Sequence, residues 1–364
     1  MKNICLMGGA VINSGDFLLE IRSHELIRHF IPDSEITVLN RVTEDYSDKI
    51  DYLNSFDAII FAGGPLYQPG LYRHQIPFVQ RERLDSIKAP LFFLGGGIKS
   101  SVYRKLFKES DKAFLGKGEH ENVSLSCRDI YTYRFLRHQG FSAIMTGCPA
   151  WYDLSNIDVT EVSSFKSHDF RNICISEPAK DVNLPLLFGL LEHLRDKYPS
   201  ATITLVNHRE IKPNVHSALN RLQEEQGIKF VNISGSVDGF SIYDKCDLHV
   251  GFRVHAHIYN LSKRNLSILF SEDIRGAGVN QTLGLENMTA EEMFYGKKQI
   301  WKNYYLMRCP DEINNPKKVA GDMFDDYLET CSQQNFHNYE YAFKTMKNTF
   351  QTMKEFFDGI KCVI

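Results

Sequence analysis

The chain has 364 residues, of which 43% are hydrophobic and 12% aromatic, and its formal net charge is −3. This composition excludes an intrinsically disordered chain. It also lacks the one-signed charge that non-specific binding of nucleic acid requires, so no nucleic-acid partner is expected. The length predicts two domains, because one domain commonly holds about 100–200 residues.

The first part of the chain alternates short apolar runs with an amphipathic pattern at 16–30. The runs lack strict alternation, which is typical of parallel strands buried on both faces. We therefore expect a Rossmann-like, doubly wound domain over residues 1–160. Its expected strands are 3–9, 35–40, 56–64 and 89–97.

A polar stretch at 154–172 holds the expected domain junction, and the same pattern then restarts. A second Rossmann-like domain is expected over 161–335, with a helix at 184–198. The two parallel-sheet domains of this α/β fold would face a cleft at the carboxyl ends of their strands, where we expect the chemistry. The expected strands are 173–176, 201–208, 228–234, 247–252 and 266–271.

The last segment, 336–364, predicts a C-terminal helix packed on a domain surface. Its apolar residues recur at steps of three and four, which places them on one helix face. They are Phe343, Met346, Phe350, Met353 and Phe357. We assign this helix no function.

The cysteines and apolar runs predict where the protein resides. The eight cysteines are scattered singly, without a Cys-x-x-Cys pair, which predicts free thiols in a reducing cytosol and no zinc site. Glycines interrupt the first apolar run well short of a secretory signal. No run approaches the ~20 apolar residues of a membrane span, so we expect a cytoplasmic protein without a transmembrane segment, with the inner face of the membrane as an alternative location.

The stretch "DLHVGFRVHA" at 247–256 carries the strongest chemical signal. If a helix runs from Val254 through Lys263, Arg253 lies at the carboxyl end of a strand and His255 in the first helical turn. A helix start and a guanidinium together bind a carboxylate or phosphate, and a histidine there can deliver a proton. An isolated Arg-x-His is more often a surface arginine and a buried histidine. The other turns of this chain favour the functional interpretation.

Several of those turns also follow strands. In "INSGD" at 12–16, Asp16 either caps the next helix or holds a ligand hydroxyl. The glycines of "AGGPLYQPG" at 62–70 and "LGGGIKSS" at 94–101 let a ligand approach the backbone, although no nucleotide-binding motif is present. In "LSCRD", Asp129 is placed to cap a helix, and Arg128 has no evident structural role.

These motifs resemble the polysaccharide pyruvyl transferase family. The resemblance rests on "NSGD", "FAGGPLY", "LGGGI", "SCRD" before "TGCPAW", and above all the stretch that begins with "DLHVGFRVHAHIYNLSKRN". It runs in order from about residue 5 to 290. The family pattern of an aspartate, an apolar pair, glycine and Arg-x-His-Ala is its most specific part.

The resemblance implies an activity. Such enzymes transfer the enolpyruvyl group of phosphoenolpyruvate to two hydroxyls of one sugar, which gives a pyruvate ketal, on a scaffold like that of glycosyltransferases with paired Rossmann-like domains. It implies donor binding by Arg128 and Arg253, with His255 as the acid. Loss of phosphate and attack by the second hydroxyl need no redox cofactor, so none is expected. No metal is expected either.

Other positions follow from the same resemblance. Arg275 stands where relatives tend to carry a lysine or arginine, so it either holds the donor phosphate or only pairs with Asp273. Cys148 stands where relatives often carry an aspartate. We expect Asn13, Asp16 and Gly64 on the acceptor side, with a sugar that is lipid-linked, nucleotide-linked or part of an oligosaccharide. Two alternative functions stay open: a nucleotide-sugar-dependent glycosyltransferase and a non-catalytic anion-binding domain.

Overall fold

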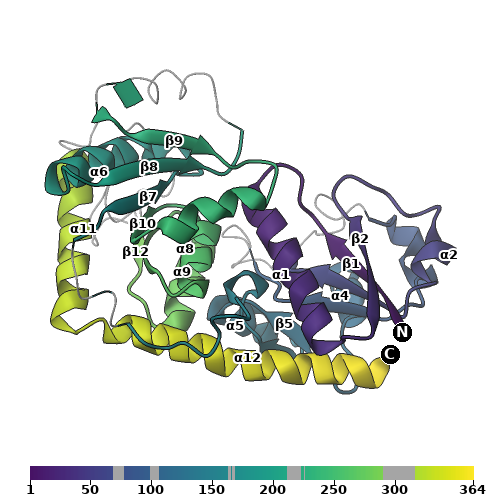
Figure 1. Ribbon diagram of the computed structural model, residues 1–364. Coiled ribbons are helices and arrows are strands. Elements are labelled where there is room, and N and C mark those ends of the chain that lie inside the picture. Colours follow the sequence, from purple (N-terminus) through teal and green to yellow (C-terminus); the bar gives the residue numbers. More distant parts are fainter. Residues whose placement is uncertain are drawn as a thin grey trace. The chain divides into compact units, whose positions relative to one another are not determined.

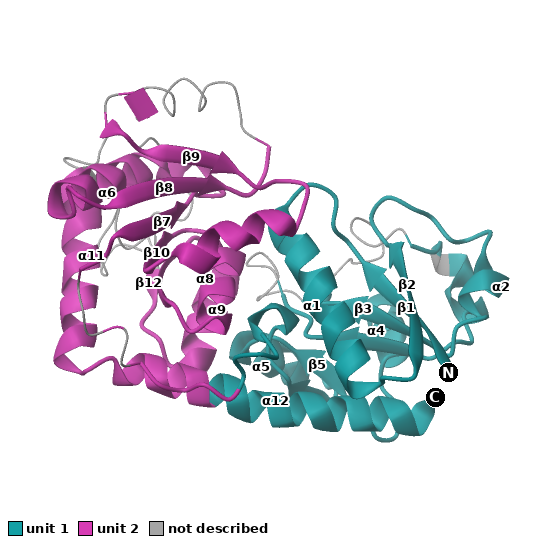
Figure 2. Ribbon diagram, viewed as in Figure 1, with its two compact units in different colours: residues 1–157, 345–364 teal, residues 158–344 magenta. Residues whose placement is uncertain are grey.

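A computed structural model describes residues 1–68, 78–98, 106–162, 165, 169–210, 223–224, 226–289 and 316–364. The chain divides into two compact units (Figure 2). Unit 1 comprises Met1–Ile157 with Thr345–Ile364, and unit 2 comprises Asp158–Lys344. None of the helices in the described ranges combines the length and apolar character that crossing a bilayer requires.

The centre of unit 1 is a 4-stranded parallel sheet with the strand order β2-β1-β3-β4 (Figure 1). Its strands are β1 (Lys2–Gly8), β2 (Ser34–Asn40), β3 (Ala58–Ala62) and β4 (Leu91–Leu94). A parallel bridge between Gly96 and Cys127 links the end of β4 to a small parallel pair. That pair consists of β5 (Leu125–Cys127) and β6 (Ala143–Met145). The direction in which the chain adds strands therefore reverses between β1 and β3.

Helices connect these strands. They are α1 (Ser14–Phe30), α2 (Ile50–Leu53), α4 (Glu109–Gly116) and α5 (Ile130–His138). Asp129 accepts a hydrogen bond from the backbone N of Thr132 at 2.8 Å and so caps α5, as the sequence predicted. The expected start of α1 at residue 16 was wrong by two residues. The helix begins at Ser14 with Asn13 as its N-cap, which leaves Asp16 in the first turn.

Unit 2 contains a 6-stranded parallel sheet with the order β12-β11-β10-β7-β8-β9. Its strands are β7 (Asn172–Ser176), β8 (Thr202–Asn207), β9 (Lys229–Asn232), β10 (Leu248–Gly251), β11 (Leu266–Ser271) and β12 (Met288–Thr289). The chain adds β8 and β9 on one side of β7, and then β10 to β12 on the other. The order therefore reverses between β7 and β10, which are direct neighbours.

The helices of unit 2 cover this sheet and each other. They are α6 (Leu184–Lys197), α8 (Val254–Ser262), α9 (Ile274–Leu283), α11 (Pro316–Gln333) and the first residues of α12 (His337–Val363). The helix α8 packs on β10 and β11, and α11 packs against α6 (Figure 1). The strands β10 and β11 are buried along their whole length. One face of each is apolar, and the other carries the buried polar residues His249 and Ser267.

The helix α12 carries the apolar stripe that the sequence predicted. Phe343, Met346, Met353 and Phe357 are fully buried, and Phe350 is half-buried. In unit 1, the Phe357 ring stacks on Phe30 of α1 with centroids 4.8 Å apart. The α/β class with parallel sheets and a C-terminal helix is therefore confirmed. Residues up to Lys344 group with unit 2, and those from Thr345 onward group with unit 1.

The stacking of Phe357 on α1 predicts a large loss of stability when the ring is removed. Phe357→Ala should lower the free energy of unfolding by about 3–5 kcal/mol, because it leaves a cavity in a closed apolar contact. Tyr341→Ala is the matched control on the same helix, since Tyr341 is 58% exposed. Urea unfolding monitored by circular dichroism measures both. Equal small losses in the two variants would contradict the packing described.

Candidate functional site

The carboxyl ends of β7 and β10 form the candidate site of unit 2. In open parallel sheets, ligands bind outside the carboxyl ends of the strands at the point where the strand order reverses. Here Ser176 ends β7 and lies in register with Gly251, which ends β10. A Cβ on Gly251 would lie 2.5 Å from the Ser176 carbonyl oxygen, and its φ is +153°. Only glycine therefore allows the strand ends to approach so closely.

Arg253 and His255 lie where the sequence predicted. Arg253 is the N-cap of α8, and His255 is in the first turn of that helix. The backbone N of Arg253 donates to the Ser176 Oγ at 3.1 Å, which fixes the helix start against β7. Both side chains are partly buried at the carboxyl edge of the sheet. A guanidinium, a helix N-terminus and an imidazole are thus gathered in one turn.

Glu177 is the immediate partner of Arg253. It follows β7 directly, and its Oε1 accepts hydrogen bonds from Arg253 Nη2 and, at 3.0 Å, from the His208 backbone N. The side chains are only 14% (Arg253) and 10% (Glu177) exposed. Burial raises the pKa of the Glu177 carboxyl above its usual value, and the charge of Arg253 opposes that shift. The pair is therefore a buried ion pair at the reversal point.

The Glu177–Arg253 pair leaves two buried atoms without a hydrogen-bond partner among the described residues. They are Arg253 Nε and Glu177 Oε2. Buried polar atoms are nearly always hydrogen-bonded in folded proteins, so an unpaired donor beside an unpaired acceptor is a specific feature. It marks this pair as a candidate contact for a polar ligand.

The segment after Glu177 is held by side chains from two neighbouring strand ends. Glu272, which follows β11, accepts from the backbone N of Ala179 at 2.6 Å and of Lys180 at 2.9 Å. Arg209, which follows β8, donates to the Ala179 carbonyl oxygen. These contacts fix the edge of the site from both sides. The backbone N–H groups also satisfy the buried Glu272 carboxylate with hydrogen bonds.

A buried polar network lies directly beneath the strand ends. The His249 ring on β10 is 3.0 Å from Ser176 Oγ and 2.7 Å from Ser267 Oγ, and the His257 ring is 2.8 Å from the same Ser267 Oγ. Burial lowers the pKa of both imidazoles, to about 3 for His257. The rings are therefore neutral at physiological pH, and the network anchors Ser176, which in turn orients Arg253.

Arg275 forms a local ion pair at the neighbouring strand end. Asp273 caps α9, and its carboxylate accepts from Arg275 Nε at 3.0 Å and from Nη2 at 2.6 Å. The Arg275 side chain is 39% exposed. The pairing that the sequence left open is thus present. A role in phosphate binding stays a prediction.

The acceptor residues predicted in unit 1 lie at the other reversal point, at the ends of β1 and β3. Asn13 Nδ2 donates to Asp16 Oδ2 at 3.0 Å, and Gly64 follows β3 with φ +76°. Between them lies the buried Arg41, whose Nη1 donates to the Met7 carbonyl oxygen at 3.1 Å. Burial lowers the pKa of Arg41, and Asp16 and Glu20 oppose that shift. Oxygen atoms and a guanidinium thus gather at this edge.

Arg128 is held firmly in unit 1. Its Nε donates to Asp129 Oδ2 at 2.9 Å and its Nη2 to the Ile98 carbonyl oxygen at 3.0 Å. A Cβ on Gly97 would lie 2.1 Å from Arg128 Nε, so this glycine makes room for the guanidinium. Burial raises the pKa of the nearby Cys148 thiol to about 11, and Arg128 opposes that shift. Cys148 is therefore neutral and does not supply the charge of an aspartate.

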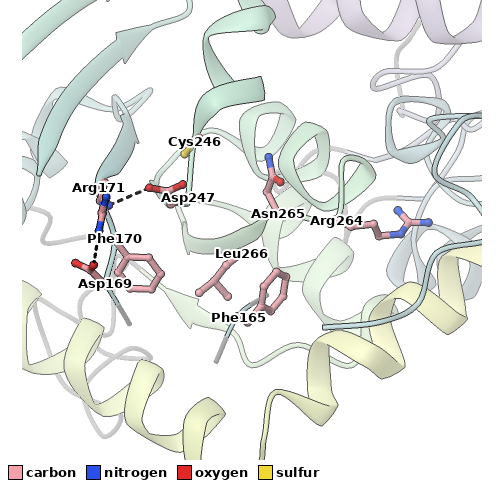
Figure 3. A pocket seen from close by; sticks show the side chains of 9 residues that line it. All are labelled: Phe165, Asp169, Phe170, Arg171, Cys246, Asp247, Arg264, Asn265 and Leu266. Atoms are coloured by element: carbon pink, nitrogen blue, oxygen red, sulfur yellow. Dashed lines mark hydrogen bonds and ion pairs between the residues drawn. The ribbon is translucent and has the colours of Figure 1, made fainter. Parts of the chain in front are cut away.

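A pocket of about 270 Å³ lies at the opposite edge of the unit 2 sheet (Figure 3). Arg171, Asp247 and Leu266 line it at the amino ends of β7, β10 and β11. Asp247 Oδ2 accepts from the backbone N of Arg171 at 2.9 Å and of Asn172 at 2.8 Å, so this carboxylate has a structural role. We assign no chemistry to this edge. Within the described ranges, no three His, Cys, Asp or Glu side chains gather as metal ligands would.

A family model described as polysaccharide pyruvyl transferase matches residues 13–259, which is more than half of the chain. The chain belongs to this family. The match includes Arg128, Glu177, Arg253 and His255. No curated protein matched the sequence.

Solved structures share the fold at low sequence identity. The S. aureus MnaA–UDP structure has 13% identity and a TM-score of 0.53, covering 92% of this chain and 98% of that chain. A UDP-GlcNAc 2-epimerase from Neisseria meningitidis bound to UDP-GlcNAc has 11% identity, a TM-score of 0.51 and coverages of 90% and 100%. Anabaena Alr3699/HepE with UDP-glucose has 10% identity, a TM-score of 0.50 and coverages of 100% and 100%. The glycosyltransferase-B-like fold predicted from the sequence is confirmed.

Sequence reasoning missed two charged residues at the reversal points. Glu177 stands directly after the strand in "ICISEPAK", and Arg41 directly after the strand in "ITVLNR". The signal was available, because each is a charged residue at the carboxyl end of an apolar run. Their buried contacts are long-range, and nothing in the sequence pattern identifies those partners.

The neutral His257 predicts a specific dependence of stability on pH. The unfolded chain binds a proton below pH 6.5, whereas burial holds the pKa of folded His257 at about 3. The free energy of unfolding should therefore rise with pH across this window, by about 1.4 kcal/mol per pH unit from this group. The contribution is complete above pH 6.5 and is lost as the pH falls toward 3.

The variant His257→Gln tests this dependence. Glutamine keeps a polar group near Ser267 but cannot titrate. The free energy of unfolding of this variant should therefore rise less steeply with pH than that of the wild type. His337→Gln is the control, because the His337 side chain is 73% exposed. Urea unfolding at a series of pH values gives the slopes. Identical slopes in all three proteins would contradict a neutral His257.

Proposed function

We propose that the protein transfers the pyruvyl group of phosphoenolpyruvate to two hydroxyls of one sugar and so forms a pyruvate ketal in polysaccharide biosynthesis. Family membership supports pyruvyl transfer. The observation that carries the proposal is the unpaired Nε of Arg253 at the start of α8, two residues before His255. Phosphoenolpyruvate carries a carboxylate and a phosphate, and a guanidinium at a helix N-terminus complements either group.

The proposed mechanism follows from these positions. Arg253 holds an anionic group of the donor, and His255 protonates its methylene carbon, which becomes a methyl group. The adjacent carbon becomes a cation, and a sugar hydroxyl attacks it. Phosphate then leaves, and the second hydroxyl attacks the same carbon. Of the two hydroxyl protons, one replaces the proton that His255 gave to carbon, and the other leaves with the phosphate.

In this proposal the residues of unit 1 serve mainly the acceptor. Asn13 and Asp16 supply hydrogen-bonding groups for sugar hydroxyls, and Gly64 lets the sugar approach the backbone. Arg128 is proposed to bind the donor, on the basis of the family resemblance. Some structures of the same fold hold UDP or a UDP-sugar. A nucleotide-linked acceptor is therefore one of the acceptor classes to test.

Product analysis tests the proposed function. The protein is incubated with phosphoenolpyruvate and a panel of galactosides, glucosides and mannosides, both free and nucleotide-linked. Mass spectrometry should find the ketal of one acceptor, with an equal amount of released phosphate. If sugar is instead transferred from a nucleotide sugar, without consumption of phosphoenolpyruvate, the protein is a glycosyltransferase and the proposal fails.

His255→Ala should reduce turnover by ~10²-fold or more, the contribution of a positioned acid. The affinity for phosphoenolpyruvate should change little, because Arg253 remains. Steady-state kinetics and calorimetric titration give the two quantities. His337→Ala is the control and should match the wild type. Normal turnover in His255→Ala would show that this histidine is not the acid.

Loss of Arg253 should weaken donor binding by about 1.5–3 kcal/mol, the usual contribution of a charge-assisted hydrogen bond. The single variant leaves Glu177 buried without its partner, so the test uses Arg253→Ala combined with Glu177→Gln. Arg171→Ala is the control, because the Arg171 side chain is 79% exposed. Calorimetry should show a tenfold or greater loss of affinity in the double variant and none in Arg171→Ala. Arg128→Ala is titrated separately, and unchanged affinity would remove Arg128 from the donor site.

A further inference from the structure

The ion pair between Arg253 and Glu177 uses one nitrogen of the guanidinium and one oxygen of the carboxylate. Arg253 donates through Nη2 alone to Glu177 Oε1. Arg253 Nε and Glu177 Oε2 are buried, and neither has a partner among the described residues. Arg275 and Asp273 show the complete arrangement within this same chain, in which Nε and Nη2 both contact one carboxylate. The Glu177–Arg253 pair therefore lacks the second hydrogen bond that the Asp273–Arg275 pair has.

The unpaired Nε lies on the same edge of the guanidinium as Nη2. A carboxylate or phosphate that binds an arginine through two parallel hydrogen bonds uses two adjacent N–H groups. Nη2 carries two N–H groups, so an anion on the Nε edge would contact the same nitrogen that Glu177 contacts. The bound anion and the Glu177 carboxylate would then share one guanidinium and lie next to each other.

Two adjacent negative charges are strongly unfavourable in a buried site. The charged and titratable groups that face Glu177 come from several elements. Arg253 at the start of α8, and His208 and Arg209 after β8, lie next to Glu177. Tyr243 also interacts with Glu177, and His249 and His255 lie near His208. Burial lowers the pKa of His208 and His249, so both are neutral and offset no charge. Arg209 is the other cation, but its guanidinium donates to the Ala179 carbonyl oxygen and lies 4.0 Å from Asp181. A bound anion therefore favours a neutral Glu177.

We propose that an anion binding to Arg253 displaces the Glu177 carboxylate from Nη2, and that Glu177 takes up one proton in the same step. The protonated carboxyl keeps an acceptor for the His208 backbone N, and its new O–H is a donor that can face the bound anion. Burial, which already raises the pKa of Glu177, favours this outcome. Glu177 is thus a positioning residue that couples donor binding to protonation.

This inference rests on the proposed anion site at Arg253 but not on the identity of the donor. It is therefore tested with sulfate, which is a dianion throughout the neutral range and does not itself titrate. Calorimetric titrations at one pH are carried out in two buffers that differ in ionisation enthalpy. If binding takes up a proton from the buffer, the observed heat differs between the two buffers by the amount that one proton requires.

The wild type should show this buffer-dependent heat, and its sulfate affinity should fall by up to tenfold per pH unit as the pH rises. Glu177→Gln should bind sulfate with the same heat in both buffers and with little dependence on pH. Asp153→Asn is the matched control. Asp153 is also a buried carboxylate, paired with Arg22 at 3.2 Å, and this variant should behave like the wild type.

Three results would overturn the inference: no sulfate binding by the wild type, buffer-independent heat in the wild type, or unchanged buffer dependence in Glu177→Gln. The double variant Arg253→Ala with Glu177→Gln should bind no sulfate at this site. If the double variant bound sulfate as the wild type does, the anion would bind elsewhere, and this result would also contradict the inference. Proton uptake with sulfate, combined with no ketal formation in any acceptor assay, would sink the proposed function and leave this inference standing.

Discussion

The buried ion pair of Glu177 and Arg253 is the interaction on which the account of unit 2 depends. It exists because the strand order reverses between β7 and β10, so residues far apart in the sequence end side by side. A buried pair of charges requires good geometry to offset its desolvation. The close approach at Gly251, with Ser176 bonded to the backbone of Arg253, provides that geometry.

The rest of the unit 2 sheet supports this pair. His249 connects Ser176 to Ser267, and Ser267 in turn is contacted by His257 and, through its carbonyl oxygen, by the Tyr339 hydroxyl of α12 at 2.7 Å. A chain of buried polar contacts thus runs from the final helix to the residue that orients Arg253. The neutral histidines are central to it, because charged rings would be destabilising at this depth.

Much of this arrangement follows from the sequence. The apolar runs located β1 to β4 and β7 to β11 to within a few residues, whereas the short strands β6 and β12 were not predicted. The strand end and helix start around Arg253 were predicted correctly. Asp129 was predicted as a cap because capping is local. The partners of Arg253 and Arg41 were not predicted, since they depend on which strands become neighbours. The start of α1 was misplaced because Asn13 and Asp16 are both plausible caps, and local pattern did not separate them.

A crystal structure of the protein with phosphoenolpyruvate tests the central claim most directly. The account predicts that an anionic group of the donor lies on the Nε and Nη2 edge of Arg253, with Glu177 displaced from Nη2 and the His255 ring close to the methylene carbon. It would be contradicted by a structure in which Glu177 keeps its contact with Nη2 and the donor binds elsewhere, for instance in the pocket at the amino ends of the strands (Figure 3).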